Sequence, residues 1–173
     1  MNTRGMKQVG KGAFSTVYRH THNTVLIKSV DNVKECMSLG WFPDTPMFPS
    51  IERIGQSDDG ITQFYTERYY DKVKSVRSNL TQFEYQFYSE LRKISVPYTT
   101  NEDGFTFLHK AFSDLPNKFW RKKELLKEAL DGLANYGNDI RFEISPRNIA
   151  IHGKKLVLLD CFFFISQLEE IRK

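Results

Sequence analysis

Short runs of β-branched and aromatic residues occupy the first part of the chain, and turn-forming residues separate them. Such runs are typical of strands, whereas glycine, asparagine and aspartate accept the backbone conformations of tight turns. The pattern predicts five strands, at residues 6–10, 14–20, 24–30, 51–55 and 61–65. A short helix is predicted after the third strand, because Asp31 or Asn32 can cap its start and Gly40 suits its end.

Beyond Tyr70 the spacing of apolar residues becomes helical. One set recurs every three or four positions, as on one face of a helix: Leu80, Phe83, Phe87 and Leu91. A longer helix is predicted over residues 116–136 and a β-hairpin over residues 148–151 and 156–159, whereas the turn-rich residues 101–107 are ambiguous. We therefore expect an α+β fold in two lobes. Residues 1–70 would hold a five-stranded antiparallel sheet with one helix, and residues 71–173 the remaining helices and the hairpin.

Composition narrows the class of protein. Forty per cent of the residues are hydrophobic, with 14 Phe and eight Tyr, which predicts a folded chain. A formal charge of +4 is too small to indicate a nucleic-acid partner, and no nucleic-acid-binding motif is present. No apolar run has the length of a membrane span, so no membrane association is expected. Cys36 and Cys161 form no C-x-x-C pair, which favours a location in a reducing cytoplasm. The sequence does not indicate an oligomeric state.

The turn between the first two predicted strands suits a phosphate group. Residues 9–18 read Val-Gly-Lys-Gly-Ala-Phe-Ser-Thr-Val-Tyr. Gly10 and Gly12 let the backbone approach a triphosphate without a Cβ clash, and free amide groups there can bind phosphate oxygens. A lone glycine pair can equally be an ordinary hairpin turn. The candidate nucleotide contacts of this segment are Val9, Gly10, Gly12, Phe14, Ser15 and Val17.

Four polar residues elsewhere complete this candidate site. Lys28 ends the strand Val-Leu-Ile-Lys, where its ammonium can pair with phosphates or simply face solvent. Glu143 and Asn148 lie five residues apart in a predicted loop, and Asp160 follows four apolar residues. Phosphoryl transfer needs a carboxylate near the acceptor hydroxyl and oxygen ligands for Mg²⁺. We therefore assign Glu143 to the acceptor and Asn148 with Asp160 to the metal, although the latter two can also serve as a turn residue and a strand cap.

In this order the segments resemble the protein-kinase-like superfamily over most of the chain. Asn-Ile-Ala-Ile from Asn148 is similar to the strand after the catalytic loop of that family, and Asp-Cys-Phe from Asp160 is similar to its D-F-G motif. Ser145 stands where the small atypical RIO kinases have a serine. The short link from Lys28 to the helix and the proline-rich connection after it look most like the early serine/threonine protein kinases of lytic podoviruses.

The resemblance implies a minimal bilobal kinase-like fold and an enzyme that uses ATP and Mg²⁺. It implies that Glu143 and Lys28 are catalytic, and that Glu35 orients Lys28. It also places Leu26 against the adenine and Glu67 in the hinge, where backbone groups rather than its side chain would meet the base. The implied partners are host proteins, as substrates or targets, in the host cytoplasm if the chain is phage-encoded.

Three departures from the family pattern leave alternatives open. Glu143 replaces the usual aspartate, Asp-Cys-Phe lacks the flexible glycine, and the chain stops thirteen residues after Asp160, before the helices that usually bind protein substrates. The first interpretation is an active serine/threonine protein kinase. The second is a pseudokinase that binds nucleotide or a host protein without phosphoryl transfer. The third is phosphotransfer to a small molecule, as in aminoglycoside kinases.

Overall fold

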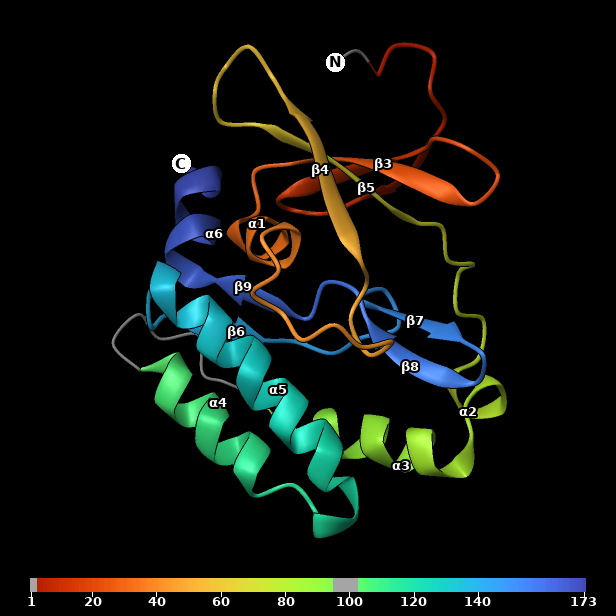
Figure 1. Cartoon of the computed structure of the whole chain (residues 1–173), viewed down its shortest axis with the longest axis vertical. Coiled ribbons are helices and arrows are strands. Elements are labelled where there is room, and N and C mark those ends of the chain that lie inside the picture. The colour runs from red at the N-terminus through yellow and green to blue at the C-terminus, as the bar shows by residue number, and fades with distance from the viewer. Residues whose placement is uncertain (1–2, 95–102) are drawn as a thin grey trace.

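The computed structural model describes residues 3–94 and 103–173. Its first part is a five-stranded antiparallel sheet in the order β1-β2-β3-β5-β4 (Figure 1). The strands are β1 (Gln8–Lys11), β2 (Ser15–Arg19), β3 (Thr24–Ser29), β4 (Ile51–Gln56) and β5 (Gln63–Arg68). All five predicted strands are confirmed, although β5 begins and ends later in the chain than the sequence pattern indicates.

Helix α1 (Asn32–Ser38) is inserted between β3 and β4 and contacts β4, β9 and α5 (Figure 1). The Asp31 carboxylate caps it by accepting a hydrogen bond from the Val33 amide at 2.9 Å. At its other end Gly40 adopts a φ of +76°, a conformation that glycine accepts without strain. Both predicted ends of this helix are therefore confirmed.

The second part is mostly helical. Its helices are α2 (Val76–Asn79), α3 (Gln82–Leu91), α4 (Gly104–Ser113), α5 (Trp120–Leu133) and α6 (Ile165–Arg172). Short 3₁₀ turns, Asn117–Phe119 and Ala134–Tyr136, flank α5. The predicted hairpin is β7 (Ile149–His152) with β8 (Lys155–Leu158), and β6 (Ile140–Phe142) pairs with β9 (Phe162–Phe164).

The predicted α+β fold, a five-stranded antiparallel sheet with one helix followed by helices and a hairpin, is confirmed. Helices α2, α4 and α6 and the β6–β9 pair were not expected from the pattern. Helix α4 covers most of the ambiguous stretch, whose residues 101–102 lie outside the described ones. Within the described ranges, no helix is long and apolar enough to cross a membrane.

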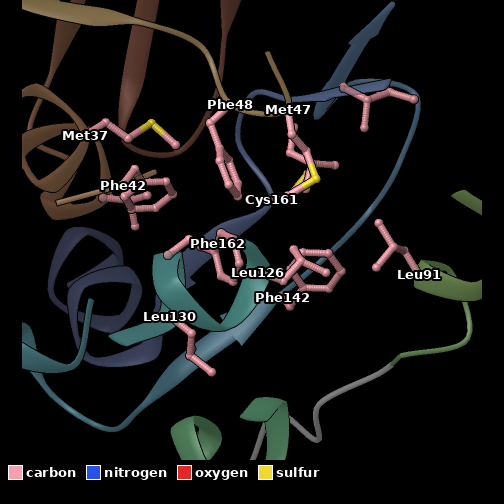
Figure 2. Close-up of a cluster of buried hydrophobic side chains, with 14 of the residues drawn as sticks. Met37, Phe42, Met47, Phe48, Leu91, Leu126, Leu130, Phe142, Cys161 and Phe162 are labelled. Atoms are coloured by element: carbon pink, nitrogen blue, oxygen red, sulfur yellow. The ribbon is translucent and has the colours of Figure 1, made fainter. Parts of the chain in front are cut away.

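A continuous hydrophobic core joins the two parts of the chain (Figure 2). Phe42 packs edge-on against Phe48 and Phe162, with ring centroids 5.1 and 6.1 Å apart, respectively. Met37 of α1 and Leu130 of α5 belong to the same buried cluster. The division at residue 70 therefore stays a prediction, since residues on both sides of it share one core.

Helix α6 ties the last residues of the chain to the start of α1. Gln167 Nε2 donates hydrogen bonds to Val30 O at 2.5 Å and to Asn32 Oδ1 at 3.1 Å. The Asn32 amide donates in return to Gln167 Oε1 at 3.3 Å. These bonds hold the first turn of α1 in place, and that turn contributes a residue to the cavity described next.

Candidate functional site

A cavity of about 780 Å³ opens between the sheet and the loop that leads into β7. Strands β1 to β3 line one side of it, and residues 143–150 with 159–160 line the other. The end of β5 and the connection after it, residues 67–73, line a third side. The cavity therefore brings together segments from both ends of the chain, as the sequence predicts for the candidate site.

Most of the predicted site residues line this cavity. They are Val9, Gly10, Gly12, Ser15, Val17, Glu67, Glu143, Asn148 and Asp160. Four predicted residues do not line it: Phe14, Leu26, Lys28 and Glu35. The first set stays the candidate site. The contacts of the four residues in the second set are described below.

The glycine turn lies directly over Asp160. A Cβ atom placed on Gly12 would be 4.0 Å from Asp160 Oδ2. The Gly12 amide is not free, because it donates to Ser15 O at 2.9 Å, whereas the Ala13 and Phe14 amides have no acceptor among the described residues. Free amides are thus present in the turn, one and two residues after Gly12, although neither of these residues lines the cavity.

Ser15 and Phe14 serve the structure of this turn. The Ser15 hydroxyl is buried and lies 2.6 Å from the Ser29 hydroxyl of β3. Phe14 is half-buried, and its carbonyl accepts hydrogen bonds from the Val30 amide at 3.1 Å and the Ser29 hydroxyl at 3.2 Å. These contacts tie the turn to the end of β3, so Phe14 anchors the turn rather than covering the cavity.

Strand β3 faces the cavity with Val25 and Ile27, not with Leu26 and Lys28. Successive side chains of a strand point to opposite faces, so the two pairs cannot share a face. Leu26 is buried on the far side of the sheet, and Lys28 is exposed. The placement of Leu26 and Lys28 at the cavity, expected from the sequence, is therefore corrected.

Lys34 of α1 supplies the ammonium that Lys28 does not. Its Nζ lies 3.0 Å from Asp160 Oδ1 and 3.8 Å from Asp31 Oδ2, and its side chain is only 6% exposed. The Asp31 cap sets the start of α1, which places Lys34 in the first turn of the helix, on the side that lines the cavity. The pattern of the sequence did not indicate Lys34, although its spacing of three residues from the Asp31 cap was an available signal.

Glu35 has a partner of its own. The Tyr136 hydroxyl donates a hydrogen bond to Glu35 Oε2 at 2.8 Å, which joins α1 to the end of α5. Burial, together with this carboxylate, raises the pKa of Tyr136. The expectation that Glu35 orients Lys28 is therefore corrected: its described contact lies outside the cavity and does not involve a lysine.

Three carboxylates surround the single ammonium of Lys34. Burial lowers the pKa of Lys34, but attraction to Asp160, Asp31 and Glu67 outweighs burial and holds that pKa above its ordinary value. Burial raises the pKa of Asp31 to about 6 and that of Glu67 to about 7, although Lys34 opposes both shifts. The protein thus holds more buried negative than positive charge here, a state that costs stability.

The loop that carries Glu143 and Asn148 is held by the backbone. The Asn148 carbonyl accepts from the amides of Leu159 at 2.9 Å and Asp160 at 3.2 Å, and from the Cys161 thiol at 3.2 Å. The Glu143 amide donates to Cys161 O at 2.8 Å, and Asn148 Nδ2 donates to Glu143 O at 3.4 Å. The side-chain oxygen of Asn148 and the exposed carboxylate of Glu143 thereby stay available to a ligand.

The free energy of unfolding is expected to fall as the pH rises from about 5 to about 8. The folded protein keeps protons on Asp31 and Glu67 above the ordinary carboxyl pKa values of 3.8 and 4.5. Below those values the favourable contribution is fully present, and it is lost as the pH rises through about 6 and about 7. Urea denaturation should show a loss on the order of 2–3 kcal/mol.

Glu67→Gln should flatten this pH dependence, because the amide does not titrate. Glu52→Gln, on the exposed face of β4, is the matched control and should keep the slope of the wild type. An unchanged slope in Glu67→Gln would show that this carboxyl is not the buried titrating group.

Neither a protein-family model nor a characterised protein sequence matches the chain. Some solved structures are similar in shape. A mutant of aminoglycoside 2′-phosphotransferase-IIIa with GDP is 15% identical, with a TM-score of 0.45. The streptomycin–ATP complex of APH(2″)-IIa is 14% identical and ADP-bound APH(2″)-Ib is 13% identical, each with a TM-score of 0.37. Each comparison covers 94% of this chain and 68% of the other. This likeness is distant and does not indicate a function for the chain.

Proposed function

We propose that the protein is a phosphotransferase that binds ATP in the cavity and transfers the γ-phosphate to a hydroxyl group. The observation that carries this proposal is the Lys34–Asp160 pair directly beneath the glycine turn. A lysine and an aspartate 3.0 Å apart beneath a glycine turn can bind phosphates and their counter-ion. Glu143 and Asn148 line the same cavity, where an acceptor would approach.

The cavity suits a nucleotide in size and polarity. Its volume lies within the range of small-molecule sites, roughly 300–1,000 Å³. Val17, Val25 and Ala150 offer apolar surface for a base, whereas Lys11 and Lys34 offer positive charge for phosphates. A nucleotide therefore fits with its base against the apolar walls and its phosphates toward Lys34.

Asp160 and Asn148 fit Mg²⁺. Lys34 engages Asp160 Oδ1, which leaves Oδ2 on the side of Gly12, and the Asn148 side-chain oxygen accepts no hydrogen bond from the described residues. Mg²⁺ prefers oxygen ligands and usually takes one or two from the protein and others from phosphates. When bound, it would neutralise charge on the phosphates.

Glu143 is the residue we assign to the acceptor hydroxyl. Its carboxylate is exposed at the cavity, so a side chain of another protein can reach it. A carboxylate there can accept the hydroxyl proton as the new phosphate ester forms. This accessibility, with the sequence resemblance, supports serine and threonine of host proteins as the acceptors.

The direct test is transfer of labelled γ-phosphate from Mg·ATP to proteins of a bacterial lysate. We expect labelled serine or threonine that depends on Mg²⁺ and disappears in Asp160→Ala. Calorimetric binding of Mg·ATP without transfer to any protein or aminoglycoside would instead support the pseudokinase. Label on an aminoglycoside alone would support the small-molecule enzyme. Absence of both binding and transfer would overturn the proposed function.

A further inference from the structure

The Glu67 carboxylate is a buried ligand-facing group without a partner. It lines the cavity near the end of β5, opposite Val25 of β3, and is only 8% exposed. Among the described residues no N–H or O–H group donates a hydrogen bond to it. Lys34 attracts it electrostatically but places its ammonium on Asp160. A buried carboxylate in this state gains much from any donor that enters the cavity.

The position of Glu67 excludes a phosphate as its partner. Its negative charge repels an anion, and Lys34, which attracts it, holds its ammonium on Asp160. Val25 lies directly across from Glu67 in the sheet, so the carboxylate adjoins an apolar wall suited to a flat ring. The missing partner is thus a hydrogen-bond donor on the edge of a base.

We propose that Glu67 selects the base of the nucleotide by accepting a hydrogen bond from the 6-amino group of adenine. The inference rests on the proposed ATP site and adds a specificity-determining side chain to it. Guanine and hypoxanthine carry an oxygen at the same position, which the carboxylate repels. Purine without a 6-substituent provides no donor and leaves the carboxylate buried and unpaired.

The probes are the Mg²⁺ complexes of ATP and of purine riboside triphosphate, which differ only in the 6-amino group. Calorimetry at about pH 8, where the carboxylate is mostly ionised, should show ATP binding about 10- to 100-fold more tightly to the wild type. Glu67→Leu should reduce this ratio to about threefold or less, because no acceptor is left to be unpaired. Glu52→Gln, a surface control, should keep the full ratio.

The outcomes separate this inference from the proposed function. Equal binding of both nucleotides to the wild type, or full discrimination by Glu67→Leu, would overturn the role of Glu67 and leave the ATP site intact. Binding of neither nucleotide would overturn the ATP site itself. A loss of discrimination in Glu67→Leu should not come from unfolding, because replacing a buried unpaired carboxylate by leucine should raise Tm. A thermal melt of each variant checks this.

Discussion

Glu143→Gln should bind Mg·ATP as the wild type does and transfer phosphate about 10²- to 10⁴-fold more slowly. The amide is nearly isosteric with the carboxylate but cannot accept the proton of the acceptor hydroxyl. Because the Glu143 side chain is exposed and its backbone makes the described contacts, the fold should be unaffected. Calorimetry and a transfer assay under the same conditions measure the two effects separately.

Two further variants sharpen this test. Glu128→Gln, on the exposed face of α5, is the matched control and should transfer at the rate of the wild type. Glu143→Asp shortens the side chain by one methylene: a slower rate indicates a loop adapted to glutamate, and a faster one indicates a substitution that has weakened an ancestral aspartate site. Transfer by Glu143→Gln at the rate of the wild type would remove Glu143 from the catalytic site.

Lys34→Met should weaken Mg·ATP binding about 10- to 100-fold, whereas Lys28→Met should leave it unchanged. Both lysines lie close together in sequence, but only Lys34 lines the cavity and contacts Asp160. Lys28 is exposed on the other face of β3, so its loss removes no contact with a ligand in the cavity. Calorimetric titration of the two variants compares the lysines directly.

The removal of Lys34 also leaves Asp31 without its counter-charge and should lower Tm. The double variant Lys34→Met/Asp31→Asn avoids this effect, because asparagine still caps α1 but carries no charge. Weak nucleotide binding by a stable double variant would confirm the assignment. Loss of binding in Lys28→Met, with binding retained in the double variant, would return the role to Lys28.

The sequence predicted the segments of the cavity more reliably than the direction of its side chains. Gly12, Asn148 and Asp160 meet because the turn, the loop and the hairpin form where their local patterns indicate. Strand β3 differs, because Val25, Leu26 and Ile27 are all buried. Its sequence therefore lacks the alternation of apolar and polar residues that shows which side chains point to which face of the sheet. The lysine at its end was then the only guide, and it pointed to the wrong face.

Other features could not be predicted, because the segments are short or because they depend on residues far away in the sequence. Strands β6 and β9 have three residues each, too few for a recognisable pattern, and they form because they pair with one another. The side chain of Glu67 was assigned no role, because its interactions with Lys34 and Asp160 join residues far apart in the sequence, which no local pattern shows.

The hydrogen bonds between Gln167 and the start of α1 make the position of Lys34 depend on a residue of α6. Selection that preserves the site should therefore also act on Gln167. Gln167 does not line the cavity, yet it exchanges hydrogen bonds with Asn32 two residues before Lys34. Replacing Gln167 removes its bonds to Val30 and to Asn32, whereas replacing Asn32 removes only the Oδ1 acceptor and leaves the bonds to the backbone. Related sequences should therefore keep Gln167 more strictly than Asn32. A helix that does not line the cavity should thus be constrained together with the site.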